Sequence, residues 1–149
     1  MKRDQKYPET ATFHYYNANP KNRITGDCAF RAISTALGQT WEQTVREMAE
    51  ISIKTGYAIN DTKGIEKYLE SKGWVKHKQP RKRDNTKYTG WEFCKELTCD
   101  IMAVGKTFIA NIGGHHIVCI KETGQHGFHK VWDTWNSTDG CIGNYWTKG

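Results

Sequence analysis

The sequence predicts an α+β domain in which N-terminal helices pack on a C-terminal antiparallel β-sheet. Between residues 28 and 98, apolar residues recur at the spacing of amphipathic helices, and capping residues precede each segment. From residue 106 the chain is rich in β-branched and aromatic residues, interrupted by Gly pairs and polar turns. Helices followed by strands are typical of an α+β fold. The sequence contains no internal repeat and no linker, so residues 1–149 are expected to form a single domain.

The segment ahead of the first long helix predicts little regular structure. Residues 1–10 are polar and are expected to form a tail, and the aromatic run ATFHYYN at 11–17 predicts a short edge strand. A helix is then expected to begin at Cys28, with Asp27 as its N-cap, and to end at Gly38. Its apolar positions follow helical spacing, at Ala29, Ala32, Ile33, Ala36 and Leu37.

Two further helices are predicted from the residues at their ends. Thr40 and Gln43 form the capping-box pattern at the start of a helix that should end before Gly56. Asp61 predicts the N-cap of the next helix, which Gly73 should terminate.

The last predicted helix is short, and the strands follow it. Thr89 and Glu92 repeat the capping-box pattern and predict a helix through Leu97. The rest of the chain predicts an antiparallel meander of strands at residues 106–112, 116–122, 127–133 and 141–146. The core is expected to include the aromatic side chains of Trp41, Tyr68 and Trp91.

The net charge of +6 is concentrated in one segment. Residues 76–87, KHKQPRKRDNTK, carry six Lys and Arg against one Asp, while the rest of the chain is close to neutral. Pro80, Asp84 and Asn85 predict that this segment is a loop. Such a basic loop is either simply solvated or contacts an acidic protein or a nucleic acid. The side chains that would make the contact are Lys76, Lys78, Arg81, Lys82, Arg83 and Lys87.

The composition excludes several classes of protein. With 37% hydrophobic residues and six Trp, the chain is not a disordered tail. No apolar run approaches the length of a membrane span, and none follows the N-terminal charges as in a secretory signal. We therefore expect no membrane contact and a cytoplasmic location. The five Cys show no disulfide framework and are expected to be thiols.

The segment ITGDCAFRAISTALG, residues 24–38, places a cysteine at the start of a predicted helix. At this position Cys28 meets unpaired backbone N–H groups and the positive end of the helix dipole, which stabilise the nucleophilic thiolate. The carboxylate of the neighbouring Asp27 acts in the opposite direction. A cationic histidine near Cys28 would have to outweigh this carboxylate. Arg31 is either a solvated helix residue or a partner of Asp27.

The sequence GGHHIVCIKE offers such a histidine at the start of a strand. His115 and His116 cannot both face Cys28, because successive strand side chains point to opposite faces. Asp133 ends the following strand, where it is either a turn-forming residue or the group that orients the imidazole. A cysteine, a histidine and this carboxylate would provide a nucleophile, a base and an orienting group.

This order of motifs resembles the papain-like cysteine peptidase fold in its small form, and small phage and bacterial proteins of cysteine-peptidase-like type. GDC at 26–28 is similar to the turn that carries the nucleophile, HIV at 116–118 to the start of the strand with the base, and DTW at 133–135 to the orienting motif. The motif GDCAFRAIS is similar also to that of ovarian-tumour-type deubiquitinases, although Thr25 replaces their Asp before the Gly. The papain-like resemblance spans residues 22–136. If the protein is phage-encoded, the expected cytoplasmic location is the cytoplasm of the host.

The papain-like resemblance implies roles for individual residues. It favours His116 over His115 as the base, and leaves His115 exposed or beside a substrate groove. It places Asn22 in the oxyanion hole together with the backbone N–H of Cys28, although the family usually has the longer Gln there. Trp135 is implied to shield the hydrogen bond between histidine and carboxylate from water. We expect the substrate to lie against Asp27, His115 and Trp135.

The predicted activity is hydrolysis of a peptide, isopeptide or related amide bond by Cys28, His116 and Asp133, with no cofactor and no metal. Deamidation and acyl transfer use the same groups and stay open. One alternative is a non-catalytic binding module of the same fold, which docks an acidic protein or nucleic acid through residues 76–87. In a further alternative Cys28 is an inert, buried side chain. A zinc site is the chemical competitor, with candidate ligands Cys94, Cys99, His126 and His129.

Overall fold

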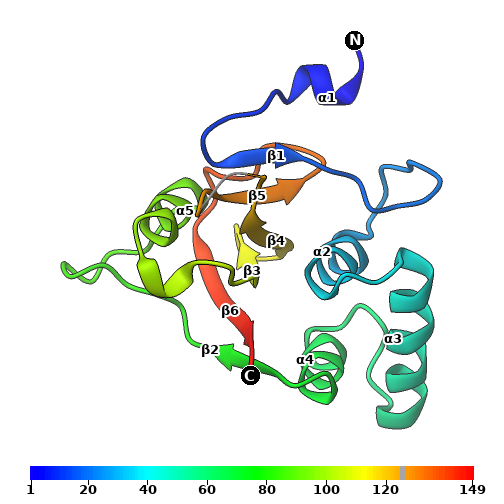
Figure 1. Ribbon diagram of the computed structural model, residues 1–149. Coiled ribbons are helices and arrows are strands. Elements are labelled where there is room, and N and C mark those ends of the chain that lie inside the picture. The colour runs from blue at the N-terminus through cyan, green and yellow to red at the C-terminus, as the bar shows by residue number, and fades with distance from the viewer. Residues whose placement is uncertain (125–126) are drawn as a thin grey trace.

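The computed structural model describes residues 1–124 and 127–149 and is built around one six-stranded sheet (Figure 1). The strands lie in the order β1-β5-β4-β3-β6-β2. Neighbouring strands are antiparallel, except that β1 and β5 are parallel. The strand bounds are β1 Phe13–Tyr15, β2 Trp74–His77, β3 Phe108–Ile112, β4 His116–Glu122, β5 His129–Asp133 and β6 Ile142–Lys148.

Helices cover both faces of this sheet, and the mixture of helices and strands confirms the predicted α+β class (Figure 1). On one face α2 packs against β4 and β3, and α3 and α4 extend this layer toward β2, while α5 packs on the opposite face against β5. Among the described residues, no helix has the length and apolar character needed to cross a membrane. The helix bounds are α1 Arg3–Lys6, α2 Cys28–Leu37, α3 Trp41–Thr55, α4 Thr62–Ser71, α5 Gly90–Thr98 and a 3-10 turn at Ile101–Ala103.

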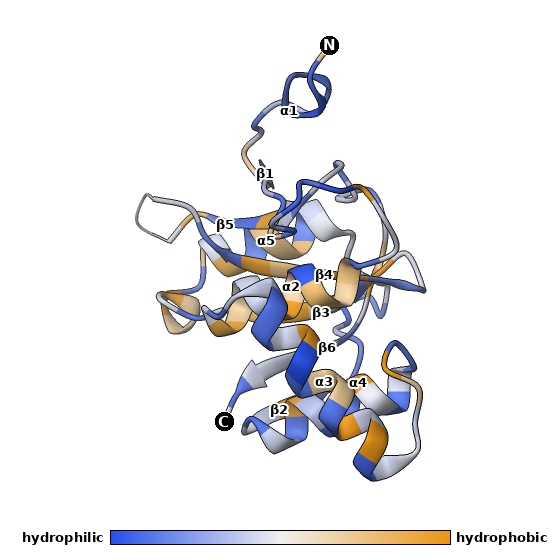
Figure 2. Ribbon diagram, turned by 90° about the vertical axis from the view of Figure 1, so that its right-hand side faces the viewer, coloured by the Kyte–Doolittle hydropathy of each residue, from blue (hydrophilic) through white to orange (hydrophobic). Residues whose placement is uncertain are grey.

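The alternation of side chains along β4 explains why the protein has two apolar cores. Ile117 and Cys119 pack into the core beneath α2, whereas Val118 and Ile120 pack into the core beneath α5. A strand that is buried on both faces needs a continuous apolar run, which is what this segment has. In Figure 2 the central strands β3 and β4 carry mostly hydrophobic residues, while the N-terminal helix α1 is hydrophilic.

Capping side chains fix the starts of three helices where the sequence predicts them. Thr40 accepts the backbone N–H of Gln43 at the start of α3, and Asp61 accepts a backbone N–H at the start of α4. Thr89 and Glu92 form a complete capping box at α5. Each of these bonds satisfies an N–H group that has no partner inside its helix, so these predictions are confirmed.

Other predicted helix ends are correct in position but not in every contact. Gly38 and Gly56 end α2 and α3 with φ of 67° and 80°, the left-handed conformation that glycine adopts without strain. Gln43 does not close the predicted box, because its side chain donates to Glu47. Asp27 directly precedes α2, but its carboxylate makes no capping hydrogen bond. The prediction of Asp27 as the N-cap residue is therefore confirmed in position, but its side chain does not make the hydrogen bond that such a residue usually makes.

The sequence predicts the positions of the C-terminal strands but not their order. Strands β3, β4 and β5 are neighbours in sequence order, as in a meander, but β6 crosses the sheet and pairs with β3. In addition, β2 begins in what was expected to be irregular chain and pairs with β6. Both differences arise from pairing between segments far apart in the chain, which local patterning does not specify.

Two smaller predictions also differ from the structure. The N-terminal segment is not a free tail, because residues 3–6 form α1 and Nε of Arg3 donates to the carbonyl oxygen of Thr134 at 2.7 Å. The expected aromatic core is correct for Tyr68, which is buried, and wrong for Trp91, which is 38% exposed.

Two of the six cations in the basic segment 76–87 form ion pairs with glutamates outside the segment. Lys76 lies in β2 and its ammonium is 2.6 Å from a carboxylate oxygen of Glu66. Lys82 forms an ion pair with Glu92, the capping residue of α5. The remaining cations occupy exposed positions, at Lys78, Arg81, Arg83 and Lys87.

Candidate active site

Cys28 occupies the first position of α2, at the end of the helix that lies near the start of β4. Cys28 is half-buried, and the imidazole of His116 and the backbone N–H of Ile117 act on its thiol so as to lower its pKa. The N–H groups in the first turn of a helix have no intrahelical partners, and the helix dipole is positive there. The fold therefore places the sulfur where a negative charge is favoured.

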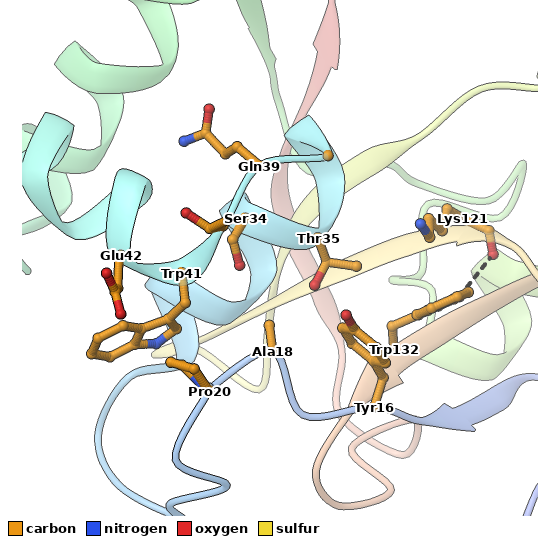
Figure 3. A pocket seen from close by; sticks show the side chains of 12 residues that line it. Tyr16, Ala18, Pro20, Ser34, Thr35, Gln39, Trp41, Glu42, Lys121 and Trp132 are labelled. Carbon is orange, nitrogen blue, oxygen red and sulfur yellow. Dashed lines mark hydrogen bonds between the residues drawn. The ribbon is translucent and has the colours of Figure 1, made fainter.

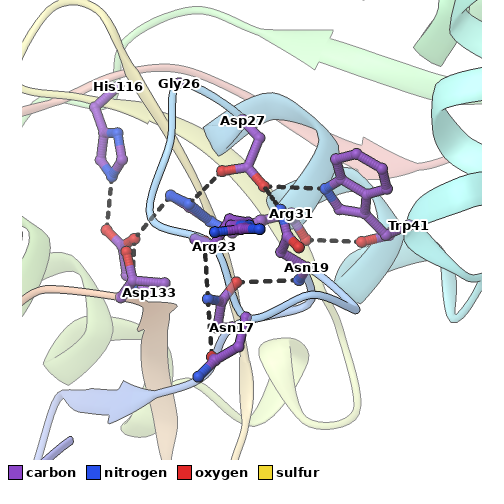
Figure 4. A network of polar contacts seen from close by, with 12 residues as sticks. Asn17, Asn19, Arg23, Gly26, Asp27, Arg31, Trp41, His116 and Asp133 are labelled. Atoms are coloured by element: carbon purple, nitrogen blue, oxygen red, sulfur yellow. Dashed lines mark hydrogen bonds and ion pairs between the residues drawn. The ribbon is translucent and has the colours of Figure 1, made fainter. Parts of the chain in front are cut away.

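Strands β4 and β5 bring His116 and Asp133 together. His116 is the first residue of β4 and Asp133 the last of β5, and the two strands are antiparallel neighbours, so these ends meet. Nε2 of His116 lies 2.6 Å from Oδ2 of Asp133. Figure 4 shows the two side chains facing one another. Because Nε2 faces the carboxylate, Nδ1 is the ring nitrogen left for Cys28.

This arrangement moves the pKa values of Cys28 and His116 in opposite directions. Burial raises the pKa of the Cys28 thiol, but hydrogen bonds from His116 and Ile117, and the charges of His116 and Arg31, outweigh burial and lower it. Burial lowers the pKa of His116, but the hydrogen bonds and charges of Asp133 and Cys28 raise it to about 9. Both shifts favour a thiolate–imidazolium pair over the neutral pair.

Two other cysteines show what burial does without such partners. Cys94 lies on the buried face of α5 and Cys119 lies in β4 beneath α2, and both are fully covered. Burial raises the pKa of each thiol to about 12. The lowered pKa of Cys28 therefore reflects its neighbours and not a general property of cysteines in this protein.

The carboxylate of Asp133 is held at both oxygens. Oδ2 accepts the hydroxyl of Ser137 at 2.8 Å in addition to the imidazole of His116. Oδ1 accepts the backbone N–H of Thr134 at 2.7 Å and lies 3.5 Å from Nη2 of Arg31. A carboxylate with donors on both sides cannot rotate freely, so one oxygen stays directed at the imidazole.

The structure places Asp27 in the interior and not beside a substrate. Its carboxylate accepts hydrogen bonds from Nδ2 of Asn19 at 3.0 Å, from Nη1 of Arg31 at 2.8 Å and from Nε1 of Trp41 at 3.0 Å (Figure 4). Only 3% of the residue is exposed, so the expected contact with substrate is not available. Of the two alternatives for Arg31, the ion pair with Asp27 is confirmed.

Asn22 does not join this group. It is exposed, has a φ of 53°, and its Oδ1 accepts Nδ2 of Asn17 at 3.3 Å. The described part of the chain contains no hydrogen bond between Asn22 and Cys28. The oxyanion role implied for Asn22 therefore finds no support in the geometry, and the backbone N–H of Cys28 remains as the donor expected for that role.

A pocket of about 500 Å³ opens beside His116. The ring of Trp135 lines it, with its centroid 5.1 Å from that of the His116 imidazole. His115 also lines this pocket from an exposed position, together with Asn136 and Asp139. His115 and Trp135 thus border an open pocket on the His116 side of the site, and Cys28 is not among the residues that line this pocket.

A larger groove of about 690 Å³ lies elsewhere, near the C-terminal end of α2 (Figure 3). The aromatic side chains of Tyr16, Trp41 and Trp132 line it. Nζ of Lys121 lies over the Trp132 ring, 4.4 Å from the ring centroid. Neither the thiol, the imidazole nor the carboxylate of the candidate site lines this groove. It meets the site only indirectly, because the Trp41 indole bonds to Asp27.

The candidate zinc ligands do not gather in the part of the chain that the structure describes. His129 is buried, and its two ring nitrogens face backbone carbonyl oxygens at 3.0 and 3.1 Å. Cys94 is buried and Cys99 is exposed, while His126 lies outside the described residues. Within residues 1–124 and 127–149, no three or more His, Cys, Asp or Glu side chains are arranged to hold a metal ion.

The sequence did not reveal that Arg31 and Ser137 contact the carboxylate of Asp133. Arg31 follows Asp27 at the i,i+4 spacing that predicts a pair on a helix, but nothing local indicates its second contact with Asp133. Ser137 lies in a loop with no periodic pattern, so only the tertiary structure reveals its bond to Asp133.

Comparison of the chain with protein-family models, with curated proteins and with solved structures finds no match. Inferences about its chemistry therefore rest on its own residues.

Proposed function

We propose that this protein is a cysteine-nucleophile hydrolase of papain-like architecture that cleaves a peptide, isopeptide or related amide bond. The observation that carries the proposal is the 2.6 Å contact between His116 and Asp133, together with the coupling of this imidazole to Cys28, which lowers the pKa of the thiol and helps to raise that of the imidazole to about 9. A nucleophile, a proton carrier and an orienting group in contact are what acyl transfer requires.

In the first half of the reaction, the thiolate of Cys28 attacks the carbonyl carbon and forms a C–S bond, while the carbonyl π electrons move to oxygen. The backbone N–H of Cys28, which has no partner inside α2, donates to this oxyanion. The oxyanion then collapses, the C–N bond breaks, and the imidazolium of His116 gives its proton to the leaving amine. The product is a thioester on Cys28.

In the second half, the now neutral His116 takes a proton from water, and the resulting hydroxide attacks the thioester carbon. The C–S bond breaks, the carboxylic acid leaves, and Cys28 returns as thiolate beside the imidazolium. Asp133 keeps Nε2 of the ring protonated and directed away from the sulfur throughout, so that Nδ1 carries the transferred proton. Thiol chemistry of this kind suits a reducing compartment, which supports the expected cytoplasmic location.

Alkylation by iodoacetamide at about pH 6, with the labelled sites assigned by mass spectrometry, tests the thiolate. An ordinary thiol with a pKa near 8.5 is only about 0.3% ionised at this pH. Cys28 should react ahead of Cys99 and Cys141, which are exposed and serve as internal controls. The H116A variant should lose this selectivity. Equal labelling of all three thiols in the wild-type protein would overturn the proposal.

Acyl transfer is tested with p-nitrophenyl acetate, whose acetyl group should appear on Cys28 and then be released. The matched variant is C28S, which keeps the size of the side chain but is not ionised at neutral pH. We expect a burst of nitrophenol from the wild-type protein and none from C28S. Acetylation spread over lysines, with the same rate in both proteins, would contradict a hydrolase.

A specific observation also favours a second function, the docking of an acidic partner. Lys78, Arg81, Arg83 and Lys87 are exposed on the basic segment, while the other two cations of that segment are paired. We propose that this surface binds an acidic protein or a nucleic acid. A double charge reversal at Arg83 and Lys87 should weaken binding to a short DNA duplex, with a steep dependence on salt, whereas C28A should not. Unchanged binding in the charge-reversed variant would exclude this surface.

A further inference from the structure

Arg31 is a buried cation that contacts two carboxylates from different parts of the fold. It lies one turn after Cys28 in α2 and is only 7% exposed. Nη1 is 2.8 Å from Oδ1 of Asp27, and Nη2 is 3.5 Å from Oδ1 of Asp133 (Figure 4). A buried guanidinium is costly unless its charge is paired, and here both arms of its planar fork face a carboxylate.

The first of these carboxylates is itself fixed from outside the helix. Asp27 accepts the amide of Asn19, in the loop before α2, and the indole of Trp41, at the start of α3. With the guanidinium, three donors from three segments converge on its two oxygens. The carboxylate of Asp27 can therefore hold Arg31 in one orientation, and it does this in place of capping α2 with its side chain.

We propose that Arg31 is a positioning residue, which holds Asp133 in the orientation that bonds His116 and links that carboxylate to the helix carrying Cys28. This inference deepens the proposed hydrolase function and rests on it. Oδ1 of Asp133 is occupied by Arg31 and by the Thr134 N–H, so Oδ2 is the oxygen left for the imidazole.

The charge of Arg31 has a second effect, on the thiolate. Asp27 and Asp133 place two negative charges near Cys28, and both oppose the ionisation of its thiol. The guanidinium lies between these carboxylates and offsets part of their charge. The guanidinium thereby acts in the same direction as His116 and Ile117, which make the larger contributions to the lowered pKa of the Cys28 thiol.

Three variants separate the position of Arg31 from its charge. R31Q removes the charge, R31K keeps the charge but cannot span two carboxylates, and R46Q makes the same change as R31Q at an exposed position of α3. Circular dichroism establishes that each variant is folded. The rate of Cys28 alkylation against pH reports the thiolate, and the downfield proton NMR signal of Nε2–H in His116 reports its bond to Asp133, with H116A assigning the signal.

We expect R31Q to react about tenfold more slowly at pH 6, which corresponds to a rise of about one unit in the pKa of the thiol, and to lose or broaden the downfield signal. R31K should keep a pH profile close to that of the wild-type protein but broaden the signal. R46Q should change neither. An R31Q protein with the wild-type profile and signal would overturn the inference.

If R31Q does not fold, the test rests on R31K. A downfield Nε2–H signal of His116 that is the same in R31K as in the wild-type protein would then overturn the inference. The two proposals fail separately in this experiment. A wild-type protein without selective alkylation at pH 6 contradicts the hydrolase, whereas the downfield signal, compared between wild type and the Arg31 variants, tests the positioning role by itself.

Discussion

Nε2 of His116 and Oδ2 of Asp133 lie 2.6 Å apart, across the ends of two antiparallel strands. The carboxylate is 3% exposed, so water does not compete effectively for its oxygens. This contact fixes which ring nitrogen faces the sulfur of Cys28, and it is one of the reasons that the pKa of His116 rises to about 9. The consequences can be measured.

Replacing Asp133 by Asn should uncouple the imidazole while preserving the size of the side chain. We expect the pKa of His116 to fall from about 9 toward its ordinary value, because the negative charge beside Nε2 is removed. Acyl transfer should fall by about 10²- to 10⁴-fold. NMR titration of the imidazole and the p-nitrophenyl acetate burst provide the two measurements. The control is D139N, which makes the same change at an exposed aspartate that lines the pocket beside His116. This variant should change the pKa of His116 little.

Stability should depend on pH through the same imidazole. Because the folded pKa of His116 is raised to about 9, its contribution is fully present below the unfolded value of about 6.5 and is lost as pH rises through about 9. The lowered pKa of Cys28 contributes in the opposite sense, so C28A is the suitable background. Urea unfolding of C28A and C28A/H116A should show a difference in free energy that shrinks as the pH rises above 6.5. Because C28A lacks the hydrogen bond and the charge by which Cys28 raises the pKa of His116, this difference should be lost at a lower pH than about 9. A difference that grows with pH would contradict the assignment.

Glu47 should stabilise the contact between α3 and α4. Its carboxylate lies 2.8 Å from Nζ of Lys72 and accepts the hydroxyl of Tyr68 at 2.6 Å. These hydrogen bonds hold the pKa of Glu47 at about 2, so its contribution is present above about pH 4.5 and is lost as pH falls toward 2. E47Q should lower the free energy of unfolding by about 1 kcal/mol at neutral pH. E50Q, an exposed change on the same helix, should have almost no effect in the same urea titration.

Gly90 should not tolerate a side chain, although alanine is the better helix former. A Cβ at this first position of α5 would lie 2.7 Å from Cδ1 of Ile112 and 3.0 Å from Cα of Thr138. We expect G90A to lower the free energy of unfolding by about 1–3 kcal/mol, because backbone as well as side chain must move. G26A, whose Cβ would meet no atom within 4 Å, is the matched control. Equal stability of the two variants would show that the loop at Thr138 yields easily.

The sequence predicted those site residues whose role depends on residue type and on a position at the start of a helix or strand. Cys28 begins a helix because Gly38 and the apolar spacing between them define that helix, and His116 begins a strand because a continuous apolar run follows it. The role expected for Asn22 was implied by the papain-like resemblance, which places such a residue at a set distance along the chain before Cys28. That distance does not determine direction, and the structure turns Asn22 to solvent.

Asp27 shows most clearly why local rules are not sufficient. An aspartate directly before a helix is normally its cap, because the nearest unpaired donors are the N–H groups of the first turn. In this fold the indole of Trp41, the amide of Asn19 and the guanidinium of Arg31 reach the same carboxylate. A cation and two further donors hold it more strongly than a neutral backbone N–H would, so the side chain turns inward.

By itself, the sequence determined the α+β class, the capped starts of three helices, and the placement of Cys28 and His116 at the beginnings of their elements. These properties depend on hydrogen bonds and apolar spacing within a few residues. Only the tertiary structure decided the pairing of β6 with β3, the ring nitrogen that faces Asp133, and the second contact of Arg31. Each of these joins segments that are distant in the chain, and their distances are set by how the sheet and its helices pack as a whole.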